Sequence, residues 1–149
     1  MSDALAPHLD RLRTDGYTIV LASAGGLTAN PSLYKSLPYD PARDFAPITL
    51  FGTSPFVLLA TPSLPVNNVG DLLKMASAQP GRWSYASGGN GTAMHLSGEL
   101  LKSMGRVHIV HIPYRGSGPA LMAVMSGETQ LAVADITTAA AQIKSGRVK

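Results

Sequence analysis

The stretch Trp83-Ser84-Tyr85-Ala86-Ser87-Gly88-Gly89-Asn90-Gly91-Thr92 decides the fold class of this 149-residue chain. Residues 83–86 include Trp83, Tyr85 and Ala86, and this aromatic and apolar content predicts a strand. A Gly/Ser loop over 87–91 follows, and a helix is predicted over 92–104 with Gly105 as its C-terminal cap. The residues expected to face the core from this helix are Leu96, Leu100, Leu101 and Met104. A strand that runs through a glycine loop into a helix is the building unit of α/β proteins.

The same order recurs along the rest of the chain. The predicted elements after this unit are a strand over 107–112, a loop over 115–118, a helix over 119–125, a strand over 130–134 and a helix up to Ile143, ended by Gly146. Before the unit, Asn68 is expected to cap a helix that Pro80 and Gly81 stop. Strands that alternate with helices of this length predict right-handed crossovers and a mostly parallel sheet.

The N-terminal part of the chain is richer in proline and less regular. The predicted elements are a helix over 3–13, strands over 17–22, 48–51 and 56–60, and a one-turn helix over 31–35. Proline at 31, 38 and 41 permits no longer helix there. Residues 61–65, Thr-Pro-Ser-Leu-Pro, are the best candidate linker, so we expect a boundary between two lobes at this point.

Composition excludes several classes of protein. The hydrophobic set makes up 45% of the residues and charged residues only 14%, and the net charge of +3 comes from scattered basic residues. A nucleic-acid-binding surface would need a basic cluster. The absence of cysteine excludes disulfides and thiolate metal sites, and nothing in the sequence requires a cofactor. The longest apolar runs are too short for a membrane span, and the first residues do not have the pattern of a signal peptide.

Three loops combine glycine and hydroxyl side chains with a helix start: 23–26, 87–92 and 116–119. In an open α/β sheet such loops emerge at the carboxyl ends of the strands, where ligands bind. Free N–H groups and the positive end of the helix dipole favour an anion, so a carboxylate or a phosphate is expected. The alternative is that these glycines serve only tight turns. The loops do not match the dinucleotide or P-loop patterns.

Other polar side chains carry less specific signals. His108 and His111 lie three apart in a predicted strand and would point to opposite faces, so a hydrogen bond at a sheet edge is expected for them rather than a metal. His95 could face the loop before its helix. Asp135 follows a strand and precedes a helix, which makes capping its expected role and ligand contact the alternative. Arg115 at a strand end could neutralise an anion, or simply lie in solvent.

The sequence contains no recognisable nucleophile and base pair and no G-x-S-x-G elbow, so catalysis is not expected. Ser87 and Ser117 are interpreted as hydrogen-bond donors to a ligand. Taken together, glycine and hydroxyl donors with few charges predict a neutral, polar binding cleft rather than an acid–base catalyst.

Five stretches of the sequence carry a resemblance to a known family. They are 17–23 (YTIVLAS), 30–34 (NPSLY), 37–47 (LPYDPARDFAP), 85–92 (YASGGNGT) and 113–117 (PYRGS). In this order they resemble the substrate-binding receptors of tripartite tricarboxylate transporters, also called TctC-like or Bug proteins. The resemblance runs over nearly the whole chain.

The resemblance implies a fold and a function. It implies periplasmic-binding-protein-like lobes of type II, α/β in class, that close like a Venus flytrap on a small di- or tricarboxylic acid or an amino acid and deliver it to a membrane permease. It also implies a periplasmic location. The ligand contacts that it implies are Ser23, Gly25, Ser87, Gly88, Gly89, Asn90, Thr92, Gly116, Ser117 and Asp135.

Two departures from the family pattern affect these expectations. The first loop reads Gly25-Gly26-Leu27 where the family usually has Gly-Thr-His, so the ligand preference is expected to differ. The chain also has about half the usual length. We therefore expect a partial first lobe over 1–62, a nearly complete second lobe with a parallel or mixed sheet over 63–145, and the start of a return crossover over 146–149. The alternative functions are a non-binding fragment that self-associates and, less in keeping with the sequence, an anion-handling enzyme.

Overall fold

A computed structural model describes residues 17–149, and the helix predicted over 3–13 lies outside these residues. The chain divides into two compact units. The first takes the described residues up to Thr53 together with Gly91–Ala93, and the second takes Ser54–Asn90 with Met94–Lys149.

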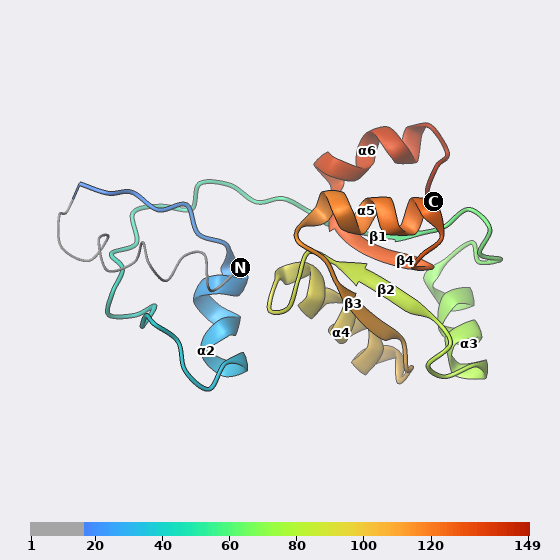
Figure 1. Ribbon diagram of the computed structural model, residues 1–149, viewed down its shortest axis with the longest axis horizontal. Helices are drawn as coiled ribbons and strands as arrows, with labels where there is room; N and C mark the ends of the chain where they lie inside the picture. Colours follow the sequence, from blue (N-terminus) through green and yellow to red (C-terminus); the bar gives the residue numbers. More distant parts are fainter. Residues whose placement is uncertain (1–16) are drawn as a thin grey trace. The chain divides into compact units, whose positions relative to one another are not determined.

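A four-stranded sheet forms the centre of the second unit (Figure 1). Its strands are β1 (Phe56–Ala60), β2 (Ser84–Ser87), β3 (Val110–Pro113) and β4 (Leu131–Asp135), in the order β1-β4-β2-β3. β2 pairs in parallel with both β3 and β4, whereas β1 pairs antiparallel with β4. The predicted α/β class and mostly parallel sheet are confirmed.

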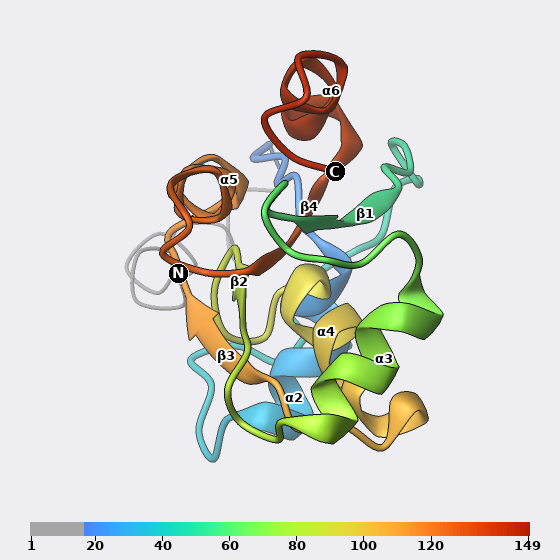
Figure 2. The same cartoon turned by 90° about the vertical axis from the view of Figure 1, so that its right-hand side faces the viewer.

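Helices cover both faces of this sheet, as Figure 2 shows. Their bounds are α3 (Val69–Ala78), α4 (Ala93–Gly105), α5 (Ser117–Ser126) and α6 (Ile136–Lys144). α5 and α6 lie on one face, and α3 and α4 lie on the other. This two-sided cover is the layer arrangement expected when strands and helices alternate along the chain.

The core consists of two clusters of buried side chains, and successive side chains of β4 belong to them alternately. Ala132 and Ala134 belong to the cluster formed with α5 and α6, while Leu131 and Val133 belong to the cluster formed with α3. All four side chains are buried. Because successive side chains of a strand point to opposite faces, the part of a strand that is covered on both sides is apolar, as residues 131–134 of β4 are.

Two helix ends show how local sequence sets the element bounds. Asn68 caps α3 as predicted, since its side chain accepts a hydrogen bond from the Asp71 backbone N–H at 2.9 Å. The cap predicted at Gly105 is wrong: α4 includes Gly105, and the left-handed conformation falls on Arg106 at φ 51°. Gly105 lies against the Leu73 side chain, where a Cβ atom would clash, so close packing of α4 on α3 explains the glycine.

The inward face predicted for α4 is partly wrong. Leu100 and Met104 are 59% and 78% exposed. The helix instead turns Met94, Gly98 and Leu101 toward the sheet. Gly98 is buried because the ring of Tyr85 occupies the place where its side chain would lie. A single glycine therefore shifts the buried face, which a hydrophobic pattern cannot reveal.

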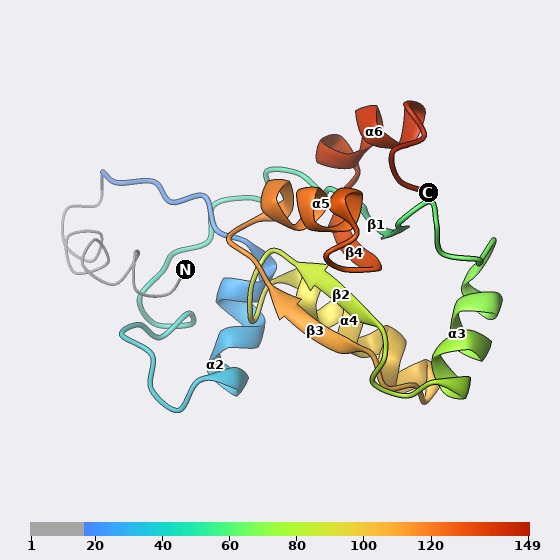
Figure 3. The same cartoon turned by 45° about the vertical axis from the view of Figure 1, so that its right-hand side comes forward.

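The first unit contains a π-helical turn, η1 (Gly25–Ala29), followed by α2 (Asn30–Leu33) (Figure 3). The one-turn helix predicted near Pro31 is confirmed. The strands predicted over 17–22 and 48–51 are wrong, because neither segment joins the sheet. Their apolar side chains are exposed, among them Tyr17, Ile19 and Phe51. A β-prone segment becomes a strand only when a neighbouring strand pairs with it.

β1 lies in the same compact unit as the rest of the sheet, although the sequence places the boundary between lobes after it, at 61–65. The last residue continues this edge of the sheet. Lys149 exchanges two backbone hydrogen bonds with Ala60, of 2.7 and 3.0 Å. The division into functional lobes over 1–62 and 63–145, with a return crossover from 146, stays a prediction.

Candidate functional site

Three parallel strands of the second unit end at one edge of the sheet. β2 ends at Ser87 and β3 at Pro113, and these two residues lie opposite each other in the register. β4 ends at Asp135 on the other side of β2. The predicted site residues that this edge brings together are Ser87, Gly88, Gly89, Asn90, Gly116, Ser117 and Asp135. Their meeting is a consequence of parallel pairing.

Backbone hydrogen bonds hold the two loops of this edge to each other. Tyr114 N donates to Ser87 O at 2.9 Å, and Gly116 N donates to Gly88 O at 3.1 Å. Gly89 and Gly116 have φ values of 126° and 107°, which side chains other than hydrogen disfavour. Glycine at these two positions therefore permits the backbone conformations of the two loops.

Ser87 is completely buried beneath its own loop. Its Oγ lies 2.6 Å from Nε2 of His111, and the Gly89 backbone N–H donates to the same oxygen at 3.2 Å. The Gly89 carbonyl oxygen is 3.4 Å away. The side chain thus ties the loop after β2 to the neighbouring strand. The hydrogen bond expected for a histidine at the sheet edge is confirmed for His111.

The imidazole of His111 lies in an aromatic stack. Its centroid is 4.2 Å from that of His95 and 4.9 Å from that of Tyr85. Burial, and then repulsion from His95, lowers the pKa of His111 from 6.5 to about 4. The ring is therefore neutral at pH 7. His108 does not join this group, since it precedes β3 and is exposed.

A charged group lies next to the stack. Tyr85 donates a hydrogen bond to Glu99 Oε1 at 2.8 Å, and Lys102 Nζ lies 2.7 and 2.8 Å from the two Glu99 oxygens. Burial and the Glu99 hydrogen bond raise the pKa of Tyr85. Burial opposes ionisation of Glu99, but the hydrogen bonds from Lys102 and Tyr85 outweigh it and lower the pKa of that carboxyl. This part of the site is a structural ion pair.

Ser117 and Asp135 meet across the start of α5. The Ser117 hydroxyl donates a short hydrogen bond to Asp135 Oδ2 and lies 3.1 Å from the Met94 sulfur. Asp135 occupies the N-cap position of α6, yet its side chain makes no capping hydrogen bond. The capping role expected for Asp135 is therefore wrong. The residue lies at the N-cap position, but its carboxylate accepts a hydrogen bond from Ser117 and not from the helix backbone. Asn90 and Arg115 are exposed at the same edge.

The remaining predicted site residues lie in the first unit. Ser23 precedes η1 and is exposed, whereas Gly25 within it is buried. A Cβ atom on Gly25 would clash with the Gly91 carbonyl oxygen and would lie 3.4 Å from Cα of Thr92, and both residues belong to this unit. Close backbone approach thus requires glycine at position 25. The roles of all ten residues as ligand contacts remain predictions.

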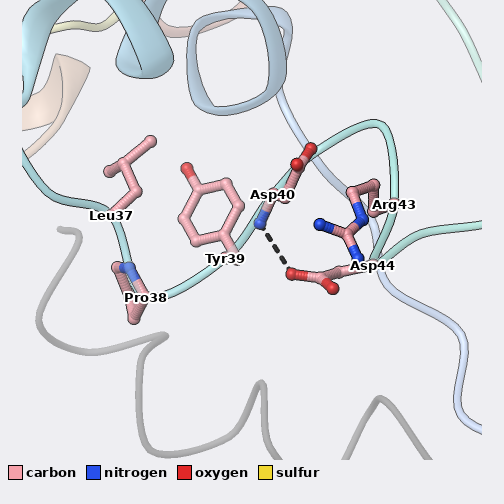
Figure 4. A pocket seen from close by; sticks show the side chains of 6 residues that line it. All are labelled: Leu37, Pro38, Tyr39, Asp40, Arg43 and Asp44. Atoms are coloured by element: carbon pink, nitrogen blue, oxygen red, sulfur yellow. Dashed lines mark hydrogen bonds between the residues drawn. The ribbon is translucent and has the colours of Figure 1, made fainter.

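The first unit also has an open hollow, lined by Leu37, Pro38, Tyr39, Asp40, Arg43 and Asp44 (Figure 4). The Asp40 backbone N–H donates to Asp44 Oδ2 at 2.6 Å across it. The Tyr39 hydroxyl points away to the Gly26 carbonyl oxygen, at 2.7 Å. These bonds brace the proline-rich segment against η1, so the hollow is explained by the fold of that segment.

Sequence reasoning missed the partners of Ser87 and Tyr85. Tyr85 and His111 could each be placed in a predicted strand from the sequence. Their contact could not be predicted, because it depends on the register in which Tyr85 lies opposite His111. Within residues 17–149, no cluster of three or more metal-ligating side chains occurs. Nor does this part of the chain have a helix long and apolar enough to cross a membrane.

Comparison with solved structures defines the class of protein. A structure described as a periplasmic transporter has a TM-score of 0.88 and 34% identity, covering 97% of this chain and 48% of that one. R. palustris Rpa4515, solved with adipate, has a TM-score of 0.90 and 32% identity, covering 99% and 49%. MatC of Rhodopseudomonas palustris, solved with malate, has a TM-score of 0.77 and 28% identity over 84% and 42%. The fold is that of periplasmic binding proteins.

The family follows from the sequence comparison. Residues 6–149 match the model of the tripartite tricarboxylate transporter family receptor, TctC. A UPF0065 protein of Bordetella pertussis is 42% identical over 137 residues, which are 91% of this chain and 42% of that protein. The chain belongs to the TctC receptor family, and the resemblance seen in the sequence is confirmed. The chain spans a little under half the length of these relatives.

Proposed function

We propose that this chain forms part of a periplasmic solute receptor that binds a small carboxylate and passes it to the membrane permease of a tripartite tricarboxylate transporter. One observation carries the proposal: glycine and serine loops meet at the carboxyl edge of three parallel strands in a member of the TctC family. The similar structures solved with adipate and malate support a dicarboxylate as the ligand. The TctC family is one of transport receptors, which favours binding without catalysis.

The chemistry of the edge suits a carboxylate. Backbone N–H groups at loops and helix starts bind anions without needing a lysine or arginine, and glycine lets the ligand approach closely. Bridging waters can complete such a site. The loops of the second unit that we assign to this role are the one after β2, with Gly88 and Gly89, and the one before α5, with Gly116 and Ser117. A ligand there would replace the hydrogen bonds that the Gly89 and Gly116 N–H groups and the Ser117 hydroxyl make within the protein. Asp135 would then favour a carboxylate that also carries a hydroxyl or ammonium donor, as malate and glutamate do.

Thermal shift in the presence of adipate, malate, citrate and glutamate tests the proposal. A ligand that binds only the folded chain raises the melting temperature as its concentration exceeds Kd. We expect stabilisation by at least one dicarboxylate at millimolar concentration, and none by adipamide, which has the length of adipate without its charges. No stabilisation by any carboxylate, at a pH where the chain is folded, would refute the proposal.

A second candidate function is self-association, favoured by the apolar side chains of the first unit. Tyr17, Ile19 and Leu21 are 93%, 80% and 78% exposed, and Ile48, Leu50 and Phe51 are similarly exposed. Exposed apolar groups of this extent mark surfaces that are covered by something else. Multi-angle light scattering tests this candidate, since a monodisperse monomer at micromolar concentration would exclude it.

A further inference from the structure

One polar contact ties the ligand loop after β2 to the next strand. The Ser87 hydroxyl is completely buried and reaches Nε2 of His111 at 2.6 Å, while the Gly89 N–H binds the same oxygen. We propose that His111 is a positioning residue which, through Ser87, holds the start of the loop over 88–90 in the shape that the carboxylate site requires. The proposal rests on the proposed function of this edge.

The neighbours of His111 make it suitable for this role. Its ring stacks on His95, 4.2 Å away between centroids, and on Tyr85 at 4.9 Å. Tyr85 is itself fixed by its hydrogen bond to Glu99 and by the close contact of its ring with Gly98. A ring in contact with two other rings is restricted in the direction in which it presents Nε2, which is the condition for positioning another group.

Hydrogen-bond accounting then assigns the role of Ser87. A serine hydroxyl has one proton to donate and can accept two hydrogen bonds. The Gly89 N–H uses one accepting site. When the proton of the neutral His111 ring is on Nδ1, Nε2 accepts the hydroxyl proton; when it is on Nε2, the ring donates and the hydroxyl proton goes to the Gly89 carbonyl oxygen, 3.4 Å away. The hydroxyl then has no proton left for a ligand. Ser87 therefore shapes the loop from within, a role that differs from the direct ligand contact expected from the sequence.

Amide hydrogen exchange of Gly89, measured by NMR on the ligand-free 149-residue chain, tests the positioning role. His111→Phe keeps a stacking ring but removes Nε2, and His111→Gln restores a polar atom at a similar reach. We expect exchange at Gly89 to become about tenfold faster in the Phe variant, which corresponds to about 1.4 kcal/mol, and to return toward the wild-type rate in the Gln variant. His108→Phe, at an exposed histidine outside the stack, is the matched control.

A merely structural role would give a different result. Loss of global stability speeds exchange of core amides such as Ala132 and Val133 in parallel with Gly89. Positioning instead changes Gly89 more than the core amides. Equal rates at Gly89 in the wild type and the Phe variant, or a parallel change throughout the core, would overturn the proposal. If the Phe variant does not fold, His111→Asn and His111→Gln form the test pair, because only glutamine reaches as far as Nε2.

Calorimetric titration with adipate at pH 7 measures the effect on binding. We expect the Phe variant to bind about tenfold more weakly than the wild type, and the Gln variant and the His108 control to bind like the wild type. Weaker binding by the Phe variant without rescue by glutamine would overturn the positioning role. If the wild-type chain binds no carboxylate, the proposed function fails, and exchange at Gly89 alone decides whether His111 positions the loop.

Discussion

His111 and His95, which are 16 residues apart in the sequence, stack with their ring centroids 4.2 Å apart and their planes 27° from parallel. One ring comes from the edge strand β3 and the other from the first turns of α4. The contact joins the sheet to the helix that follows the glycine loop after β2. Burial, and then the charges of His95, Glu99 and Lys102, determine the pKa of His111.

The pKa of His111 predicts how the stability of the second unit depends on pH. Burial lowers this pKa from 6.5 to about 4, so the unfolded chain binds a proton at a higher pH than the folded chain does. The stabilisation is fully present above pH 6.5 and is lost as the pH falls toward 4. We expect urea unfolding to show falling stability over this range. Replacing His111 with Phe should flatten that part of the profile, and an unchanged slope would contradict the prediction.

Gly98 is expected to tolerate no larger side chain. A Cβ atom there would clash with the Tyr85 ring. Alanine normally favours a helix over glycine by up to about 1 kcal/mol, but overpacking costs about 1–3 kcal/mol, so Gly98→Ala should destabilise the protein. Gly118→Ala in α5, where a new Cβ meets nothing within 4 Å, is the control and should be neutral or stabilising. A more stable Gly98 variant in chemical denaturation would contradict this packing.

The hydrogen bond between Ser117 and Asp135 should contribute to stability. Ser117→Ala leaves Asp135 Oδ2 without this donor, and the expected loss is about 1 kcal/mol of unfolding free energy. Ser126→Ala lies in the last turn of the same helix, where the exposed side chain bonds the Ala123 carbonyl at 3.0 Å. This control should change stability by less than about 0.5 kcal/mol. Equal effects of the two changes in urea unfolding would argue against the bond.

The cap of α3 gives a prediction that is independent of the site. Asn68→Ala removes the acceptor of the Asp71 N–H and should lower the unfolding free energy by about 1 kcal/mol. Asn67→Ala keeps the backbone bond of residue 67 to the Asp71 carboxylate and should have little effect. Thermal unfolding followed by circular dichroism compares the two. A larger effect at Asn67 would place the start of α3 one residue earlier.

Local sequence predicted the second unit well. The strand at 56–60, the cap at Asn68, the strand predicted over 83–86, and the helices after the glycine loops were all recognisable because each depends on residues within a few positions of one another. The family motifs identified the fold for the same reason. The gathering of Ser87, Ser117 and Asp135 at one edge also followed, since parallel strands place their carboxyl ends together.

The predictions that were wrong concern features that depend on residues far apart in the sequence. The segments over 17–22 and 48–51 have strand-like composition, but a strand requires a partner, and neither segment joins the sheet. The buried face of α4 differed because Gly98 accommodates the Tyr85 ring. Asp135 lies at the N-cap position as expected but bonds Ser117, which comes from another helix.

The sequence by itself thus determined the βα order, the loop chemistry and the family, because these are properties of short stretches read in order. Only the tertiary structure decided what the buried polar groups do. Ser87 and His111 are 24 residues apart, and their 2.6 Å contact exists because β2 and β3 pair in one register. A shift of that register by one residue would turn His111 to the opposite face of the sheet, so no local pattern could have predicted the contact.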